Sequence, residues 1–245
     1  MLRVTFIGVG GWVTNPSFGH VSILVEGGGS KVLLDFGEGS YWGYVRCVGR
    51  EPWDVDYLIL THRHGDHILG VPTLAQMARA RGRVVRIASI PDAVGAVKDL
   101  LRAVGARHCL ENLDFTELSL GSEASLGGVR VKAIPAKHSV TASSIIMKIS
   151  SYVVAYSGDT LPNPSFLSEA RGADVLIHEV SAPRELAEEA RAYGHTSEVD
   201  VEYVVSYVKP RYFIPIHYSE YLPRLPAVPG TELVAPSPCG RVVIK

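Results

Sequence analysis

Four side chains of the kinds that bind metal ions occur within six residues, in the run His62-Arg63-His64-Gly65-Asp66-His67. The apolar stretch before it, Tyr57–Leu60, has the length of a buried strand. His62 and His64 alternate, so on an extended exit from that strand their side chains point the same way. Gly65 permits a sharp turn, after which the Asp-His pair opens a helix. The run therefore requires a strand-to-helix turn at the edge of a sheet, where α/β proteins place functional groups.

The ligand types in this run indicate a transition metal. Imidazole and carboxylate groups suit zinc, iron or manganese better than calcium or magnesium. So dense a cluster is improbable in a loop of merely solvated histidines, which is the alternative interpretation. One run cannot complete two coordination shells, however, and distant partners are needed. Three residues of ligand type each follow a predicted strand, namely His138, Asp159 and His217.

The pattern along the rest of the chain predicts an α/β protein. Apolar, β-branched stretches of strand length recur at Val4–Val9, Val21–Val25, Val32–Asp35, Tyr57–Leu60, Val84–Ile87, Val129–Ile134, Ser144–Ile149, Val153–Tyr156, Val175–Ile177, Tyr212–Ile216 and Val242–Ile244. Helical periodicity covers Leu69–Arg81, Pro91–Val104, Arg184–Tyr193 and Val199–Val208. Strand-rich and mixed segments alternate without a linker. We expect one domain, residues 1–245, of two packed sheets with helices outside.

Composition excludes several classes of protein. Hydrophobic residues make up 47% and charged residues 20% of the 245 residues, as in an ordinary globular chain. The net charge of -1 argues neither for nor against a polyanionic partner. No apolar run approaches the ~20 residues of a membrane-spanning helix, and the first residues lack a signal-peptide pattern. We therefore expect a cytoplasmic protein without a membrane partner, and the sequence leaves a homodimer open.

The three cysteines, Cys47, Cys109 and Cys239, lie far apart and form no Cys-x-x-Cys pair. A disulfide framework and a thiolate metal site are both disfavoured by that spacing. We expect three buried or partly buried free thiols.

The residues singled out above resemble the metallo-β-lactamase fold superfamily over nearly the whole chain. Its H-x-H-x-D-H signature is present as the run from His62 to His67. The resemblance implies a four-layer αββα sandwich with two divalent metal ions, zinc or alternatively manganese or iron, in a cleft at one edge. It implies a ligand set in which one ion is held by His62, His64 and His138, the second by Asp66, His67 and His217, and both by the bridging Asp159.

Further motifs resemble the ribonuclease Z family, the endonucleases that process precursor tRNA 3′ ends. They are Leu34–Gly39, Gly65–Pro72, Tyr156–Thr160, His178-Glu179-Val180-Ser181 and Gly194-His195-Thr196-Ser197. The resemblance implies cleavage of RNA phosphodiester bonds by a metal-bridging hydroxide. The catalytic residues would be His195, oriented by Glu179 as a proton donor, and Asp66 as a proton acceptor. His178 is interpreted as structural.

The chain departs from that family in lacking its flexible tRNA-gripping arm, since only 21 positions (159 − 138) separate His138 from Asp159. Binding of tRNA would then need another basic surface. One candidate carries +7 − 2 = +5 charges, from Arg79, Arg81, Arg83, Arg86, Lys98, Arg102 and Arg107 against Asp92 and Asp99. A solvated helix face explains this cluster equally well.

Three hypotheses remain open on this sequence. The first is a ribonuclease Z-like endonuclease for precursor tRNA. The second is an arm-less phosphodiesterase acting on small or cyclic phosphodiesters. The third is an acyl hydrolase, for a thioester or lactone, on the same fold, because fold alone does not choose the chemistry.

Overall fold

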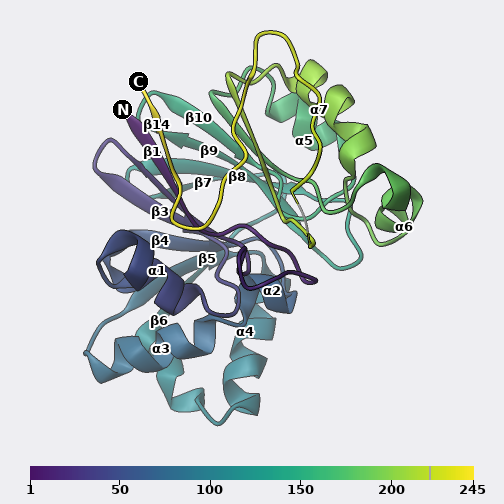
Figure 1. Cartoon of the computed structure of the whole chain (residues 1–245). Helices are drawn as coiled ribbons and strands as arrows, with labels where there is room; N and C mark the ends of the chain where they lie inside the picture. The colour runs from purple at the N-terminus through teal and green to yellow at the C-terminus, as the bar shows by residue number, and fades with distance from the viewer. Residues whose placement is uncertain (221) are drawn as a thin grey trace.

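Two seven-stranded sheets form the centre of the computed structural model, which describes residues 1–220 and 222–245 (Figure 1). The first sheet has the order β14-β1-β2-β3-β4-β5-β6. Its strands are β1 (Leu2–Gly8), β2 (Ser22–Gly27), β3 (Ser30–Leu34), β4 (Tyr57–Leu60), β5 (Val85–Ser89), β6 (Leu113–Glu117) and β14 (Arg241–Ile244). The two termini of the chain lie side by side, because β14 pairs with β1 (Figure 1).

The second sheet has the order β13-β12-β11-β10-β9-β8-β7. Its strands are β7 (Glu123–Leu126), β8 (Val129–Pro135), β9 (Ser143–Ile149), β10 (Tyr152–Tyr156), β11 (Val175–Glu179), β12 (Tyr212–Ile216) and β13 (Glu232–Leu233). In each sheet one half is antiparallel and the other parallel, with parallel pairs from β3 to β6 and from β10 to β13. The carboxyl ends of the parallel strands therefore share one edge of each sheet.

Helices cover the outer faces of both sheets (Figure 1). They are α1 (Ser40–Val48), α2 (Gly65–Ile68), α3 (Val71–Ala80), α4 (Pro91–Ala103), α5 (Pro164–Glu169), α6 (Ala187–Ala192) and α7 (Val201–Val208), with 3₁₀ turns η1 (Pro52–Asp54), η2 (Arg107–Asn112), η3 (Arg184–Leu186) and η4 (Glu198–Asp200). None of the helices within the described residues is long and apolar enough to cross a membrane.

Three apolar clusters hold the layers together. One lies between the sheets and includes Phe6, Ile23, Met147 and Ile214, all buried. A second lies under α1, α3 and α4, and a third under α5 and α7. Each fully buried aliphatic or aromatic side chain stabilises the fold by roughly 1.5–3 kcal/mol relative to exposure. The predicted αββα sandwich is confirmed.

The expectation of three free thiols is wrong. Cys47, in the last turn of α1, forms a disulfide with Cys239, just before β14, and only Cys109 is free and buried. These cysteines are 192 positions apart, but β14 pairs with β1, and α1 packs against β1. Arg241 donates a hydrogen bond to the Cys47 carbonyl at 2.6 Å and fixes the same junction. A pairing created by strand order leaves no mark in cysteine spacing.

Candidate metal centre

The run from His62 to His67 lies at the carboxyl end of β4, at the edge where the parallel strands end. Its backbone leaves the sheet at His62, which forms a single bridge to Ala142 beside β9. His64 is still extended, and α2 begins at Gly65, so Asp66 and His67 are presented from one helical turn. The strand-to-helix turn expected from the sequence is present.

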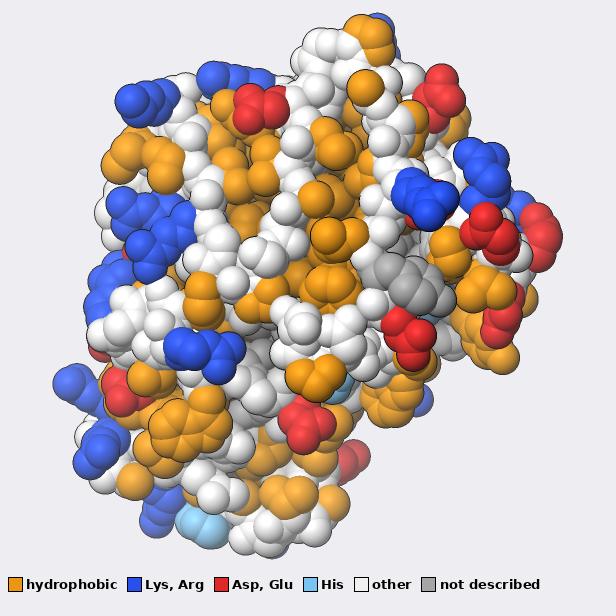
Figure 2. Space-filling view, in the orientation of Figure 1, with side chains coloured by type: hydrophobic (Ala, Val, Ile, Leu, Met, Phe, Trp, Pro, Cys, Tyr) orange, Lys and Arg blue, Asp and Glu red, His pale blue; other side chains and the backbone are white. Residues whose placement is uncertain are grey.

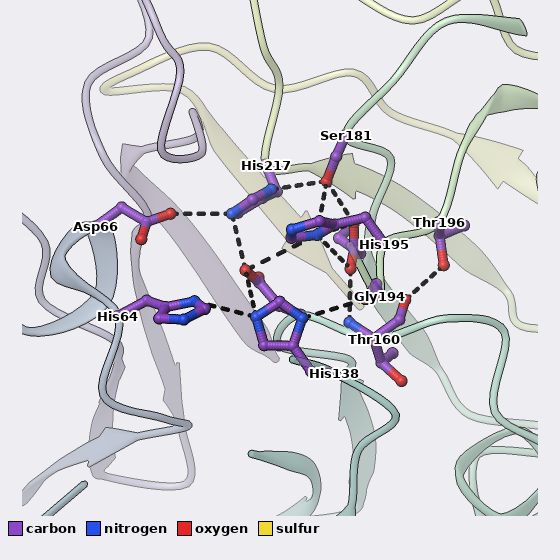
Figure 3. A network of polar contacts seen from close by, with 12 residues as sticks. His64, Asp66, His138, Thr160, Ser181, Gly194, His195, Thr196 and His217 are labelled. Atoms are coloured by element: carbon purple, nitrogen blue, oxygen red, sulfur yellow. Dashed lines mark hydrogen bonds and ion pairs between the residues drawn. The ribbon is translucent and has the colours of Figure 1, made fainter. Parts of the chain in front are cut away.

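The long-range residues reach the same place from the second sheet. His138 follows β8, Asp159 follows β10 and His217 follows β12. His195 precedes η4, in the loop after α6. Figure 3 shows Asp66, His64, His138 and His217 directed towards one centre, with Ser181 and His195 beside His217. All seven residues expected as ligands are thus brought together at one edge of the sandwich.

One group of donors consists of His62, His64 and His138 together with Asp159, and its ligand atoms all lie within 4.8 Å of one another. The His138 Nε2 atom is 3.1 Å from the His64 Nδ1 atom. Burial, followed by the neighbouring imidazoles, holds the pKa of all three histidines below its ordinary value. Neutral imidazoles crowded in this way are suited to share a cation.

The second group consists of Asp66, His67, Asp159 and His217. The His217 Nε2 atom lies 3.0 Å from an Asp66 oxygen and 3.1 Å from an Asp159 oxygen. Burial alone would lower the pKa of His217, but the two carboxylates raise it to about 10. Burial would raise the pKa of Asp66, yet His67 and His217 lower it instead. Protons on the imidazoles thus supply the positive charge that a cation would otherwise provide.

Asp159 belongs to both groups. Its Oδ2 atom lies 3.7 Å from the His62 Nε2 atom and 3.1 Å from the His217 Nε2 atom. Its Oδ1 atom lies 3.2 Å from the His67 Nε2 atom. A single carboxylate placed between two donor sets has the geometry expected of a bridging ligand.

Hydrogen bonds orient four of the five imidazoles by their outer nitrogen. The Nδ1 atoms of His62, His67, His138 and His217 contact Thr61 Oγ1, Asp35, the Gly194 carbonyl and Ser181 Oγ at 3.0, 2.9, 3.2 and 2.8 Å. These contacts turn each Nε2 atom towards the cluster. His64 is turned the other way, with its Nδ1 atom facing His138.

The buried polar atoms of the cluster test whether metal ions fit. The Nε2 atom of His62 is fully buried and has no hydrogen-bond partner among the described residues, with Asp159 3.7 Å away. Buried imidazole nitrogens without a partner are costly unless something binds them. Imidazole and carboxylate donors in two groups match transition-metal ligand sets, so the residues present fit such ions.

Asp35 contacts a candidate ligand, His67, and was not among the expected site residues. It lies just after β3, fully buried, with a positive φ of 54°. It accepts hydrogen bonds from the Thr61 amide at 2.7 Å, the His67 ring at 2.9 Å and the Tyr156 hydroxyl at 2.5 Å. Burial, then the Asp35 charge, raises the pKa of Tyr156. Its place at the end of a buried strand, like that of the other polar site residues, was the signal in the sequence.

His195 and Glu179 form a pair beside the metal groups. The His195 Nδ1 atom lies 3.1 Å from both Glu179 carboxylate oxygens and 4.0 Å from Asp159. Glu179 is fully buried at the end of β11 and also accepts the Thr160 amide at 2.6 Å. Burial would lower the pKa of His195, but Glu179 raises it above its ordinary value. The His195 side chain remains 20% exposed, so a proton on it can reach a substrate.

Ser181 connects this pair to the metal groups. Its hydroxyl contacts Glu179 closely and lies 2.8 Å from the His217 Nδ1 atom. Glu179 therefore acts on a candidate proton donor directly and on a candidate ligand through one hydroxyl. In the sequence, Ser181 stood out only as the last residue of the motif His178-Glu179-Val180-Ser181.

The other histidines lie outside both groups. His178 is buried, contacts the Glu179 carbonyl at 2.8 Å and packs near Phe166, which supports the structural interpretation. His20 flanks the backbone near Gly37 without reaching the ligand atoms. His108 is exposed in η2.

The basic cluster lies away from the ligands. Helices α3 and α4 start near the ligand edge, and Arg79 and Arg102 lie in their last turns, roughly 12 and 17 Å further along at 1.5 Å per residue. Arg79 pairs with Glu111 and Arg102 with Asp99. On the face shown in Figure 2, most Lys and Arg side chains lie along the left edge and at the upper right, and hydrophobic side chains occupy much of the centre. These observations favour a solvated helix face.

The fold and the grouped histidines and aspartates define a class of protein. The family model described as the beta-lactamase superfamily domain matches residues 32–218, most of the chain. The chain belongs to the β-lactamase superfamily, and its enzymatic class is that of the metal-dependent hydrolases.

Within that class, the chain is similar to enzymes of RNA and phosphate chemistry. It is 26% identical over 246 residues to a ribonuclease Z of Methanothermobacter thermautotrophicus, covering 80% of each chain. The structure of the short form of human tRNase Z superposes with a TM-score of 0.81 at 16% identity, covering 99% of both chains. A diphosphatase from the PhnP family superposes with a TM-score of 0.78 at 18% identity, covering 100% of this chain and 98% of the other. At these identities the solved structures show the shared fold.

Proposed function

We propose that this protein hydrolyses phosphodiester bonds with two bound divalent metal ions, zinc in the first instance, as a ribonuclease Z-like endonuclease for precursor tRNA 3′ ends. The observation that carries the proposal is the His195–Glu179 pair, 4.0 Å from the shared carboxylate of Asp159. Phosphodiester cleavage needs a proton for the leaving oxygen, and this pair supplies one beside the metal groups. The similarity to ribonuclease Z supports the same chemistry.

His62, His64 and His138 would hold one ion, Asp66, His67 and His217 the other, and Asp159 both. Two ions so held would polarise the phosphoryl oxygens and lower the pKa of a water for an in-line displacement. Asp66, kept ionised by its lowered pKa, would accept a hydrogen bond from the attacking water and take its proton as the water attacks phosphorus. Because of that low pKa, Asp66 would then release the proton to solvent.

His195 completes the reaction at the opposite end of the displacement. As the bond from phosphorus to the 3′ oxygen breaks, the electron pair stays on that oxygen, which takes the His195 proton. Glu179 stabilises the protonated ring and raises its pKa above the ordinary value, so more of the donor is charged at neutral pH than of a free imidazole. Above the raised pKa the proton is lost, and turnover should fall on the alkaline side.

A second candidate is hydrolysis of small or cyclic phosphodiesters. Two observations favour it. Only the β9–β10 hairpin separates His138 from Asp159, which leaves no room for a tRNA-gripping arm, and the basic cluster lies at the far end of α3 and α4. The shared fold with a PhnP-family diphosphatase is compatible with a small substrate.

The variant His195→Ala tests the proposed proton donor. It should leave metal content unchanged and lower kcat by ~10²–10⁴, because general acid catalysis contributes about that much. Precursor tRNA and bis(p-nitrophenyl) phosphate, assayed side by side, distinguish the two substrate classes, and a thioester tests acyl chemistry. The exposed His108→Ala is the matched control. Unchanged turnover in His195→Ala would show that the proton comes from elsewhere.

A further inference from the structure

The loop between β1 and β2 carries an exposed tryptophan at the mouth of the metal centre. Trp12 is 65% exposed and the next residue, Val13, 62%. Large aromatic side chains are usually well buried, because their burial contributes strongly to stability. Exposure alone does not assign a role, since Trp42 is 62% exposed as well, and it is the position of Trp12 relative to the metal ligands that distinguishes it.

Two glycines locate this tryptophan relative to the metal ligands. A Cβ atom built on Gly65, which lies between His64 and Asp66, would be 2.8 Å from the Trp12 Cζ3 atom. A Cβ atom built on Gly11 would be 2.4 Å from the Cε1 atom of His217. The backbone of the loop at Gly11 thus contacts the His217 ring, and the indole ring of Trp12 contacts the turn at Gly65.

The loop that carries Trp12 is anchored on both sides. The Gly11 amide donates to the Tyr218 carbonyl at 2.9 Å, and the Tyr218 amide donates to the Val9 carbonyl at 3.0 Å. Further along, the Asn15 side chain donates to the Glu220 carbonyl at 2.9 Å. The loop that carries Trp12 is therefore fixed by hydrogen bonds to Tyr218, the residue directly after His217. Such bracing reduces the ordering cost when a ligand stacks on the ring.

We propose that Trp12 is a stacking platform for an aromatic base, on the nucleotide next to the scissile phosphodiester. This inference rests on the proposed phosphodiester chemistry and narrows its substrate to nucleotide-containing diesters. A flat, exposed ring is suited to a planar base, whereas an alkyl chain needs a concave apolar groove. Stacking on a single indole binds every base, so the site should prefer nucleotides without reading their sequence.

Two substrates with the same leaving group isolate the contribution of the base. Thymidine 5′-(p-nitrophenyl phosphate) carries a base, and methyl p-nitrophenyl phosphate carries none. In Trp12→Ala, KM for the nucleotide should rise about tenfold with kcat nearly unchanged, because the contact binds substrate away from the reacting atoms. KM for the methyl ester should stay the same. Trp12→Phe should restore most of the nucleotide affinity, since it restores a stacking face.

The matched control is Trp42→Ala, which removes an indole of similar exposure, 62%, that packs against Tyr41 on α1. It should leave both substrates unaffected. If Trp12→Ala raised KM equally for both substrates, the ring would serve only to pack on Gly65, and the inference would be overturned. An unchanged nucleotide KM would overturn it as well.

If the parent protein cleaves neither diester, the proposed function fails, and binding still decides the inference. Calorimetric titration with thymidine 5′-monophosphate should then show affinity about tenfold weaker in Trp12→Ala than in the parent. Equal affinities, or no binding by the parent, would overturn the platform. If Trp12→Ala raised KM for a thioester but for neither diester, the stacking platform would be overturned in favour of an acyl substrate.

Discussion

The two ligand groups differ in charge although they share Asp159 and lie side by side. The group of His62, His64 and His138 is otherwise built from imidazoles, and burial lowers the pKa of each. The group of Asp66, His67 and His217 adds a second carboxylate, and the carboxylates raise the pKa of both its histidines. One group thus holds neutral ligands ready for a cation, whereas protons must leave the other before a cation binds.

The difference extends to the surrounding residues. In the carboxylate-rich group the outer nitrogens of His67 and His217 contact Asp35 and Ser181, both connected to further hydrogen bonds. In the imidazole group His138 is held by the backbone carbonyl of Gly194, and His62 by the Thr61 hydroxyl. Side chains therefore hold both histidines of the carboxylate-rich group but only one of the three histidines in the imidazole group, so substitutions around the ligands should act mainly on the former. The substitutions below should affect the two groups unequally, except at the shared carboxylate.

Asp159→Ala should have the largest effect, because it removes the one ligand common to both groups. We expect loss of both ions and of measurable turnover, since two-metal hydrolysis depends on the pair. Elemental analysis of the purified variant gives the metal content, and the exposed Asp114→Ala is the control. Retention of both ions would rule out the bridging assignment.

Asp35→Asn should weaken the carboxylate-rich group more than the imidazole group. The amide keeps the volume of the carboxylate but removes the charge that orients His67 through its Nδ1 atom at 2.9 Å. Asp35 reaches His62 of the imidazole group only indirectly, through the Thr61 hydroxyl. Loss of a direct partner lowers metal affinity about 10–100-fold. Titration against a chelating indicator should show one ion strongly weakened and the other much less so. Equal weakening of both ions would mean that Asp35 acts on the fold rather than on His67.

The ligand run was predictable from sequence because it is local. Strand β4, the turn at Gly65 and the helical start lie within a dozen residues, and alternation alone placed His62 and His64 on one side. His138, Asp159 and His217 come from three separate strand ends; that position made them candidate partners of the run, and the family resemblance assigned them to the two ions. Asp35 and Ser181 escaped because a carboxylate or hydroxyl that contacts a ligand has no spacing rule of its own.

Elements held by tertiary contacts were also missed. The sequence of β6, Leu-Asp-Phe-Thr-Glu, has only two apolar residues of five, and it forms a strand because it pairs with β5 at the sheet edge. Strand β13 has two residues and pairs with β12. The disulfide of Cys47 depends on the same kind of long-range pairing. That residues 1–245 form one domain and that the protein is cytoplasmic stay predictions, and the sequence leaves a homodimer open.

Acidification should separate the two ions. The pKa of His217 is raised to about 10, so protons compete for it at every pH below that value. Its group should lose affinity by about tenfold per pH unit for each proton displaced. The lowered pKa values of His62 and His138 delay the same competition to more acidic solution. Metal content measured after dialysis from about pH 8 to about pH 5 should fall in two steps. Loss of both ions in a single step would contradict the proposed difference in proton competition between the two ligand groups.

Ser181→Ala should give the smallest change, and one confined to the carboxylate-rich group. The substitution removes the hydroxyl 2.8 Å from the His217 Nδ1 atom while leaving Asp66 and Asp159 in place. One hydrogen bond contributes about 1 kcal/mol, so affinity for that ion should fall roughly fivefold. Ser181→Thr, which keeps a hydroxyl, should restore it. The same hydroxyl also contacts Glu179. If Ser181→Ala shifts the alkaline limb of the pH–activity profile as well as lowering metal affinity, the proton donor and the carboxylate-rich group are coupled through this hydroxyl.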